Sequence, residues 1–408
     1  MTADPARIEK ALEALEAHER CCRLCPRKCR VDRRSGKTGL CGLSAGLHVA
    51  AVLPHFGEEP ELVGRGGSGT IFFGGCNLSC LFCQNADISQ RAAGRTAGPE
   101  ELARLMLSLE AAGCENVNLV TPTHFAPTLG RATRLARRAG LGLPVVWNCG
   151  GYEDLEAVRL LDGLVEIFMP DFKYGPAAPA GELSGAPDYF DRCCDALAEM
   201  HRQVGVLATD PRGVARRGVL IRHLVLPDGL ADSPGVLRFI AGLSTESYVN
   251  IMDQYRPSHR AQERLGLERR TSAAEMREVR ECARSLPPSG FLTGSTVGAP
   301  EKRCSLPFHA ETQAGPPGQG DDPGGGAVIA QKKRGDADGV RKRNNRDAAG
   351  RRGCGRVYEK RRTGADPPGG AAHPGVQSQS RPEGPSVDAV CARPPLNRRN
   401  TRVSPGKR

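Results

Sequence analysis

The chain has 408 residues, of which 39% are hydrophobic and 25% are charged, so it can hold two or three domains with at least one sizeable core. No stretch approaches the roughly 20 apolar residues that a membrane helix needs, which argues against a membrane protein. The formal net charge is +11. Basic and acidic residues balance up to residue 290, so the excess belongs to the chain after it.

The first twenty residues have the pattern of a helix. Asp4 is placed as the N-cap, Pro5 lies in the first turn, and Ile8, Leu12 and Leu15 fall on one face. The segment lacks the apolar core of a signal peptide. We therefore expect a cytoplasmic protein.

A cysteine-rich segment follows this helix, with the spacing Cys22-x2-Cys25-x3-Cys29-x11-Cys41. Four thiolates this close can form a tetrahedral zinc site or ligate an auxiliary iron–sulfur cluster, and the spacing does not decide between the two. The chain has 16 cysteines, and in a cytosolic protein such clustering indicates metal or redox chemistry rather than a disulfide framework. Residues 1–60 are therefore predicted to form a helix and a four-cysteine metal knuckle.

Residues 61–290 alternate between apolar, β-branched runs and segments with helical period. Pro99 and Pro127 mark helix starts, and Ser272 with Glu275 has the spacing of a capping box. The predicted strands cover residues 70–73, 116–121, 144–149, 164–169, 219–226 and 248–252. Six successive strand–helix units predict an α/β fold with parallel strands and right-handed crossovers. Six are too few for an eight-stranded barrel, so we predict a partial, open (β/α)6 barrel.

Three cysteines, Cys76, Cys80 and Cys83, lie in one loop directly after the first predicted strand. In a parallel sheet or barrel, the loops after the strands form the active site. Three thiolates on a [4Fe-4S] cluster leave one iron without a protein ligand, and that iron can bind a substrate. The alternative is a structural zinc site with a fourth ligand from His55 or His124.

The motif Cys76-x3-Cys80-x-Phe82-Cys83 resembles that of the radical S-adenosylmethionine (SAM) superfamily. The stretches "GSGTIFFGGCNLSCLFCQN", "VNLVTPTH", "DFKY", "LIRHLVLP" and "YVNIMDQY" look like its pyruvate formate-lyase activating enzyme-like branch, over about residues 20–285. The resemblance implies that SAM binds the open iron through its amino and carboxylate groups. An electron from the reduced cluster then cleaves SAM to methionine and a 5′-deoxyadenosyl radical, with Phe82 beside the adenine.

The resemblance also implies partners and a set of cofactor contacts. The partners would be an electron donor such as flavodoxin or ferredoxin, and a glycyl radical enzyme or a small molecule as substrate. Many family members hold the SAM amino group with a Gly-Gly-Glu segment, but here that place reads Thr-Pro-Thr-His, residues 121–124. The candidate SAM or substrate contacts are Phe82, Thr121, Thr123, Asn148, Asp171, Lys173, His223 and Gln254.

Two of these candidates have structural alternatives. Asn148 could cap a helix that begins near Tyr152, and Asp171 could pair with Lys173.

Residues 291–408 are rich in Gly, Pro and Arg and show no amphipathic period, so we expect a disordered basic tail. The change in composition is abrupt, and we interpret the tail as the product of a frameshift or read-through. An alternative function is a metal-knuckle protein that binds nucleic acid through this tail. The scarcity of aromatic residues for base stacking argues against it.

Overall fold

The computed structural model describes residues 4–286 of the chain. The expectations for residues 291–408, namely disorder, a frameshift origin and nucleic-acid binding, lie outside the described residues. None of the helices within 4–286 combines the length and the apolar character that crossing a bilayer requires.

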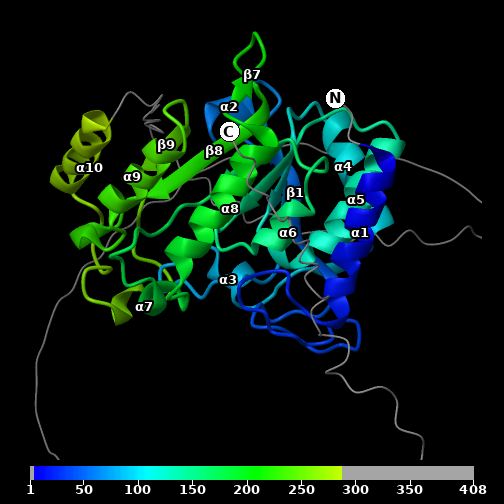
Figure 1. Ribbon diagram of the computed structural model, residues 1–408, viewed down its shortest axis with the longest axis horizontal. Coiled ribbons are helices and arrows are strands. Elements are labelled where there is room, and N and C mark those ends of the chain that lie inside the picture. Colours follow the sequence, from blue (N-terminus) through cyan, green and yellow to red (C-terminus); the bar gives the residue numbers. More distant parts are fainter. Residues whose placement is uncertain (1–3, 287–408) are drawn as a thin grey trace, which may run out of the picture. The chain divides into compact units, whose positions relative to one another are not determined.

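Helices and strands alternate along the described chain (Figure 1). The strands are β1 (Leu47–His55), β2 (Ser68–Phe73), β3 (Arg95–Ala97), β4 (Val117–Val120), β5 (Val145–Cys149), β6 (Ile167–Pro170), β7 (Ala208–Thr209), β8 (Ala215–Leu224) and β9 (Tyr248–Met252). The α-helices are α1 (Pro5–Arg20), α2 (Pro60–Val63), α3 (Ala86–Ser89), α4 (Pro99–Ala111), α5 (Ala126–Arg138), α6 (Leu155–Arg159), α7 (Ala180–Ser184), α8 (Tyr189–Val204), α9 (Ser233–Leu243) and α10 (Ala273–Ser285). Three short 3-10 helices are η1 (Thr123–Phe125), η2 (Pro227–Gly229) and η3 (Ala261–Glu263).

All six predicted strands are confirmed, as β2, β4, β5, β6, β8 and β9. They pair in this order, and each neighbouring pair is parallel. Three further strands were not predicted. β1 pairs antiparallel with β2, β3 with β1, and β7 with β8. The α/β fold with parallel strands is therefore as the sequence predicts.

The helix ends follow the signals in the sequence. The Asp4 side chain accepts from the N–H of Ala6 at 3.0 Å and caps α1, whose buried residues are Ile8, Leu12 and Leu15. Ser272 and Glu275 form the predicted capping box of α10. In Figure 1, α1, α4 and α5 lie at one side of the sheet, α6 and α8 at its centre, and α9 and α10 at the other side.

The boundary predicted between residues 60 and 61 does not separate two folding units. β1 lies before it, yet β1 is hydrogen-bonded along β2 over six residue pairs, from Val49 to His55. The first 60 residues thus supply an edge of the sheet in addition to a helix and the cysteine segment. Backbone pairing across the boundary is the physical reason, because neither strand has its hydrogen bonds satisfied alone.

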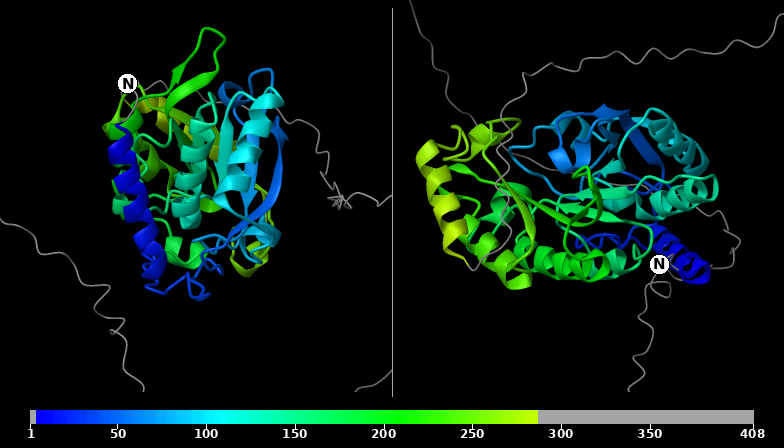
Figure 2. Two further views of the ribbon diagram at one scale, coloured as in Figure 1. Left: turned by 90° about the vertical axis from the view of Figure 1, so that its right-hand side faces the viewer. Right: turned by 90° about the horizontal axis from the view of Figure 1, so that it is seen from above.

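The parallel strands curl around the short segment that follows β1. Glu58 accepts from Asn118 on β4 at 3.2 Å and from Arg222 on β8 at 3.2 Å. Glu61 accepts from Tyr248 on β9 at 2.8 Å. Because β4 and β9 are separated by three strands in the sheet, one segment can reach both only if the sheet curves. Figure 2 shows this curved sheet with helices outside it.

Two apolar clusters lie on the two faces of the curved sheet. The inner cluster places Leu62 of α2 against side chains of β5, β6, β8 and β9, namely Val146, Ile167, Met169, Ala215, Leu220 and Tyr248. The larger outer cluster packs the helices against the opposite face. The inner cluster closes the amino-terminal end of the curved sheet, so any ligand site on this face lies toward the carboxyl ends of the strands.

Candidate functional site

A cavity of about 280 Å³ opens at the carboxyl ends of the parallel strands. Each of the six parallel strands, or the loop after it, contributes to its wall, and the three cysteines of the first loop line one side. This is the position at which parallel α/β folds bind ligands. The cavity is therefore the candidate functional site.

Each of the three cysteine sulfurs in the loop after β2 forms a hydrogen bond with an N–H or a hydroxyl group. The N–H of Leu78 donates to Sγ of Cys76 at 3.4 Å, and Oγ of Ser184 donates to Sγ of Cys80 at 3.0 Å. Sγ of Cys83 lies 3.1 Å from Oγ of Ser89. Donors aimed at sulfur stabilise thiolates and tune the potential of a cluster bound to them.

The protonation of these thiols is set by their surroundings. Burial, with the neighbouring Cys80 thiol adding to it, raises the pKa of Cys76 to about 12. Burial also raises the pKa of Cys80, although Lys173 and the hydrogen bond from Ser184 act against it. Both thiols are thus protonated at neutral pH in the absence of metal. Binding of metal would release their protons.

A network of charged and polar side chains forms the floor of the cavity. The guanidinium of Arg222 donates to Oδ1 of Asn148 at 2.7 Å, to Oδ1 of Asp171 at 2.9 Å and to Oε2 of Glu58 at 3.2 Å. Nζ of Lys173 donates to Oδ2 of Asp171 at 2.6 Å. Arg222 and Lys173 thus place two cations at the cavity, and Asp171 places one carboxylate there. Glu58 contacts Arg222 from the segment after β1.

The charges in this network hold one another ionised. Burial opposes ionisation of Asp171, but Arg222 and Lys173 outweigh it and hold the pKa of its carboxyl below the usual value. The carboxylate in turn raises the pKa of Lys173 despite the burial of that side chain. Burial raises the pKa of Glu58, which Arg222 only partly offsets. Arg222 and Lys173 therefore place two cationic groups at the floor, and these suit an anionic ligand group.

Six of the eight predicted cofactor contacts line the cavity: Phe82, Thr121, Asn148, Asp171, Lys173 and Gln254. Phe82 is 7% exposed and packs its ring against Tyr255, with centroids 5.8 Å apart. Thr121 has a positive φ of 59°, a conformation that non-glycine residues seldom adopt and that recurs at functional sites.

The structure decides the two structural alternatives, helix capping by Asn148 and pairing of Asp171 with Lys173, in different ways. Asn148 does not cap the helix after it, because α6 begins at Leu155 and is capped by Asp154. Asp171 and Lys173 do pair, but their ion pair lies at the cavity wall. Pairing and a role in the site are therefore compatible for these two residues.

The structure does not bring Thr123 and His223 into the cavity. The hydroxyl of Thr123 donates to the buried Glu153 at 2.6 Å. His223 is fully buried, with its ring nitrogens 2.7 Å from the Phe172 carbonyl and 2.8 Å from Oγ of Ser233. Side chains alternate between the faces of a strand, so His223 points away from the face that Arg222 occupies.

Arg222 is the main site residue that the sequence analysis missed. It lies in the stretch "LIRHLVLP" beside His223, and the sequence-based prediction names His223 as the cofactor contact. A charged residue among the apolar residues of the second half of β8 was the available signal, since a buried charge requires partners. The sequence does not show which face of the sheet Arg222 occupies, because β8 carries apolar residues on both faces. Cys149 and Glu58 were not assigned to the site either.

The donor set fits an iron–sulfur cluster better than a single metal ion. Within residues 4–286, no three Cys, His, Asp or Glu side chains are gathered tightly enough to hold one ion. A zinc site needs sulfurs about 3.8 Å apart, given Zn–S bonds of about 2.3 Å. His55 ends β1 at the opposite end of β2, and Nε2 of His124 lies 2.8 Å from the Gly74 carbonyl. Three soft sulfur ligands around one cavity suit a cluster that spreads its thiolates over several irons.

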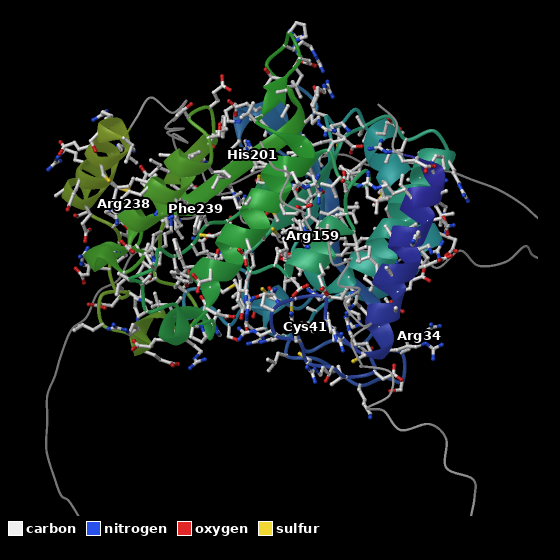
Figure 3. All side chains as sticks on the ribbon, viewed as in Figure 1. Arg34, Cys41, Arg159, His201, Arg238 and Phe239 are labelled. Carbon is white, nitrogen blue, oxygen red and sulfur yellow. The ribbon has the colours of Figure 1, made fainter. Side chains whose placement is uncertain are left out.

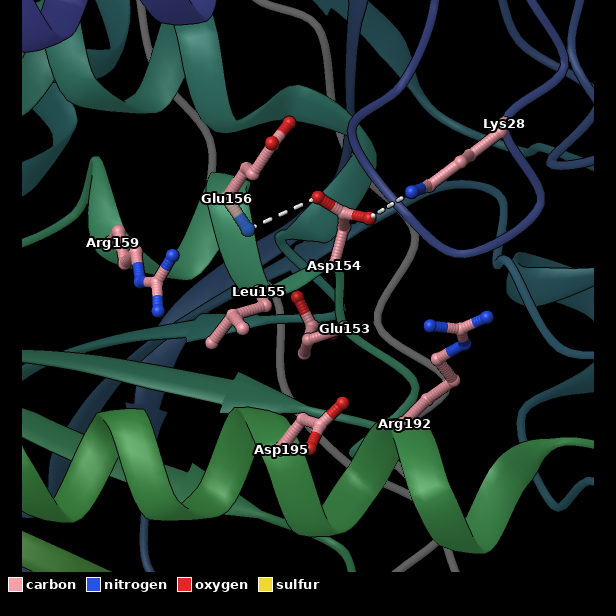
Figure 4. Close-up of a pocket in the computed structure, with 8 residues that line it drawn as sticks. All are labelled: Lys28, Glu153, Asp154, Leu155, Glu156, Arg159, Arg192 and Asp195. Atoms are coloured by element: carbon pink, nitrogen blue, oxygen red, sulfur yellow. Dashed lines mark hydrogen bonds and ion pairs between the residues drawn. The ribbon is translucent and has the colours of Figure 1, made fainter. Parts of the chain in front are cut away.

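A second cavity, of about 230 Å³, lies between the cysteine-rich segment and α6 and α8 (Figure 4). Nζ of Lys28 lies 3.1 Å from Oδ2 of Asp154 there, so these two charges satisfy each other. Its lining residues, all within 4–286, include no cysteine and none of the predicted cofactor contacts. We therefore assign the functional site to the three-cysteine cavity.

Comparisons with known proteins agree with this assignment. Residues 70–200 match the model of the radical SAM superfamily. An uncharacterized protein of Methanocaldococcus jannaschii is 32% identical over 273 residues, which cover 64% of this chain and 74% of that protein. A second uncharacterized protein of the same organism is 24% identical over 210 residues, or 46% of this chain and 56% of that protein.

Among solved structures, one similar chain is the radical S-adenosylmethionine methyltransferase TsrM from Kitasatospora setae, with cobalamin and a [4Fe-4S] cluster bound. The match has a TM-score of 0.34 and 17% identity, over 46% of this chain and 37% of that chain. The superfamily match begins in β2 and spans the three-cysteine loop and the strands through β6. The chain belongs to the radical SAM superfamily.

Proposed function

We propose that this radical SAM enzyme activates a glycyl radical enzyme by removing a hydrogen atom from a glycine of that partner. The resemblance to the pyruvate formate-lyase activating enzyme-like branch supports the proposal. The observation that carries it is the size of the cavity. At about 280 Å³ it lies just below the range, roughly 300–1,000 Å³, of pockets that hold one small ligand. A cavity filled by SAM leaves no enclosed room for a second small molecule, so the substrate approaches from outside as part of a protein.

Cys76, Cys80 and Cys83 would hold the [4Fe-4S] cluster. When bound, the cluster supplies the electron that splits SAM into methionine and the 5′-deoxyadenosyl radical. A one-electron donor of the flavodoxin or ferredoxin class supplies that electron. The radical takes a hydrogen atom from the Cα of the glycine, which yields 5′-deoxyadenosine and a glycyl radical.

The remaining cavity residues orient SAM and keep water away. Phe82 forms an apolar wall for the adenine, and its contact with Tyr255 fixes the ring. The positive floor formed by Arg222 and Lys173 attracts the carboxylate of SAM, and Asp171 offers an acceptor to its amino group. Opposite charges presented on neighbouring strand ends fit the zwitterionic methionine part of SAM.

The first test is the formation of 5′-deoxyadenosine. Reconstituted enzyme, reduced chemically without oxygen, is incubated with SAM, and the product is measured by mass spectrometry. We expect 5′-deoxyadenosine from the wild-type enzyme, and only background amounts when Cys76, Cys80 or Cys83 is replaced. Its absence from a fully reconstituted protein would contradict SAM cleavage itself.

The second test identifies the source of the hydrogen atom. The enzyme and SAM are incubated with the protein fraction of its source organism, grown on α-deuterated glycine, and in parallel with the small-molecule fraction of the same cells. Deuterium in 5′-deoxyadenosine from the protein fraction, together with the electron paramagnetic resonance signal of a glycyl radical, supports the proposal. Deuterium from the small-molecule fraction alone would overturn it, and cells grown on deuterated leucine provide the control.

A further inference from the structure

The segment that holds Cys22, Cys25, Cys29 and Cys41 folds into tight loops beside the end of α1. The N–H of Arg30 donates to the Cys22 carbonyl at 2.9 Å, and the N–H of Cys22 donates to Val31 at 3.0 Å. Figure 3 shows Cys41 among these loops. None of these four cysteines lines the three-cysteine cavity, so the function proposed above does not use them.

The backbone around Cys29 has an unusual conformation. Lys28 and Arg30, on either side of it, have positive φ values of 41° and 55°. This conformation costs free energy for non-glycine residues, and it persists only where the surrounding contacts hold it in place. Lys28 is also tied to Asp154 by an ion pair of 3.1 Å, which holds the turn in place (Figure 4).

This turn brings Cys29 toward Cys41 across a glycine. A Cβ on Gly39 would lie 3.3 Å from Sγ of Cys29 and 3.7 Å from Sγ of Cys41, so both sulfurs approach one point of the backbone. The N–H of Leu40 donates to Sγ of Cys29 at 3.4 Å. The same kind of contact, a backbone N–H that donates to a cysteine sulfur, is found at Cys76 in the catalytic loop.

The other two cysteines are buried beside them. Cys22 is 6% exposed and Cys25 is 7% exposed. The N–H of Lys28 donates to the Cys25 carbonyl at 3.0 Å, and the N–H of Arg30 donates to the Cys22 carbonyl at 2.9 Å. These two bonds flank Cys29 and hold it beside Cys22 and Cys25.

A buried arginine faces this group. Arg33 is 2% exposed and lies close to Cys22. Its terminal nitrogens donate to the carbonyls of His124 and Ser44, the latter at 2.6 Å. Its Nε has no hydrogen-bond partner among residues 4–286. A buried cation favours negative groups nearby, because an unpaired buried charge is costly. Glu19 lies within electrostatic reach of Arg33, and cluster thiolates would add to it.

The arrangement of the sulfurs favours a cluster over a single metal ion. As stated above, no three ligating side chains within 4–286 are close enough for a single ion, which counts against the zinc alternative for these cysteines. A four-iron cluster takes one thiolate on each iron and so accepts a wider arrangement. Four thiolates on such a cluster also give it a negative charge, which Arg33 would offset.

The four-cysteine segment touches the catalytic loop at two places. A Cβ on Gly75 would lie 2.7 Å from the carbonyl oxygen of Cys41, and Gly75 directly precedes Cys76. Nε of Arg27 donates to the carbonyl of Asn77, which directly follows Cys76, at 2.9 Å. Consecutive Cα atoms are about 3.8 Å apart, so the Cα atoms of Cys41 and Cys76 are separated by no more than about 10 Å.

We propose that Cys22, Cys25, Cys29 and Cys41 ligate a second [4Fe-4S] cluster, with Arg33 as its buried countercharge, next to the catalytic loop. All four iron sites of this cluster have a protein ligand, so it does not bind SAM. This separates it from the cluster on Cys76, Cys80 and Cys83.

The test counts and identifies the metals of the full chain. The protein is reconstituted with iron and sulfide without oxygen, and iron and zinc are measured by mass spectrometry. We expect about eight iron atoms per chain, four for each cluster, with zinc absent. Mössbauer spectra of the iron-57 protein should show [4Fe-4S] clusters only, and SAM should change mainly the signal of the one open iron, about one-eighth of the total.

Variants then assign each cluster to its cysteines. Cys25→Ala with Cys29→Ala should reduce the iron to about half while the SAM-dependent spectral change remains. Replacing Cys76, Cys80 and Cys83 together should leave about half of the iron and abolish the response to SAM. Cys282→Ala, in α10 and outside both groups, is the matched control and should keep all the iron.

Two results would overturn the proposal. One is wild-type protein with about four irons, whether or not it also carries zinc. The other is a Cys25→Ala, Cys29→Ala protein with the full iron content. Failure of the double variant to fold, seen by circular dichroism, does not remove the test, because the triple variant and the wild-type metal count decide it independently. Neither count depends on SAM cleavage, so the outcome is separate from that of the proposed function.

Discussion

The guanidinium of Arg222 on β8 lies 2.9 Å from Oδ1 of Asp171, which follows β6, and this pair forms the floor of the three-cysteine cavity. Fifty-one positions separate the two residues in the chain. The same guanidinium also reaches Glu58, from the segment after β1. One side chain thus links three parts of the curved sheet.

Replacement of Arg222 by Met should lower the free energy of unfolding by roughly 3–5 kcal/mol, because it removes the cation from the buried Glu58 and leaves Asp171 with Lys173 alone. Urea unfolding followed by circular dichroism measures the change. Arg260→Met is the control, since its ion pair with Glu263 is exposed, and its unfolding midpoint should stay close to that of the wild type. Equal effects of the two substitutions would show that the buried network does not hold the sheet together.

Each of Cys76, Cys80 and Cys83 should be essential for SAM cleavage. Alanine at any one position removes a ligand of the cluster, so 5′-deoxyadenosine should fall to background even with a strong chemical reductant. Product formation over time in the presence of SAM measures the effect. Cys114→Ala, a buried cysteine outside the cavity, should retain activity. Wild-type rates in the Cys80→Ala protein would disprove our assignment of this loop.

Phe82→Ala should keep the cluster but weaken the binding of SAM. It removes an apolar wall that we place against the adenine, and a base–aromatic contact contributes roughly 1–3 kcal/mol. The dissociation constant of SAM, from titration of the cluster's spectral change, should rise accordingly. Phe56→Ala, at a residue that is 63% exposed, is the control and should bind SAM normally. An unchanged dissociation constant for Phe82→Ala would place the adenine elsewhere.

Gly75→Ala should disturb both cysteine groups at once. Gly75 has a φ of 78°, and a Cβ there would lie 2.6 Å from Cδ1 of Leu43 and 2.7 Å from the Cys41 carbonyl. Gly113→Ala is a matched control, because Gly113 has a φ of 83° but no atom within 4 Å of the added Cβ. Both variants carry the backbone strain of about 1–3 kcal/mol, and only Gly75→Ala adds a steric clash. Iron content and melting temperature should fall further for Gly75→Ala than for Gly113→Ala.

Glu153 should make the protein less stable as the pH rises. Burial raises its pKa from 4.5 to about 8, against hydrogen bonds that include one from Thr123. Between these two values the folded state binds more protons than the unfolded state, so the free energy of unfolding decreases with increasing pH.

Glu153→Gln should remove this dependence, so the variant should retain on the order of 3 kcal/mol of stability that the wild type loses between about pH 5 and about pH 8. Urea unfolding at the two pH values measures it. Glu246→Gln, at an exposed position, should leave the wild-type dependence intact. A Glu153→Gln protein with the same pH dependence as the wild type would contradict this account.

The strands, the helices and the place of the cysteine loop were readable from the sequence. Apolar β-branched runs separated by capped helices specify six parallel strands, since each signal acts over a few neighbouring residues. The position of Cys76 directly after β2 follows from that order alone, because the carboxyl ends of parallel strands share one edge. The edge strand β1 was missed, as its partner could not be read from its own residues.

The tertiary structure decided which polar side chains meet. Arg222 and His223 are neighbours in the chain, yet the first faces the cavity and the second is buried behind the sheet. The sequence could not choose between them, because β8 is apolar on both faces and only the curvature of the sheet sets which face is inside. Glu58 reaches Arg222 for the same reason, since a segment far away in the chain becomes adjacent only when the sheet closes around it.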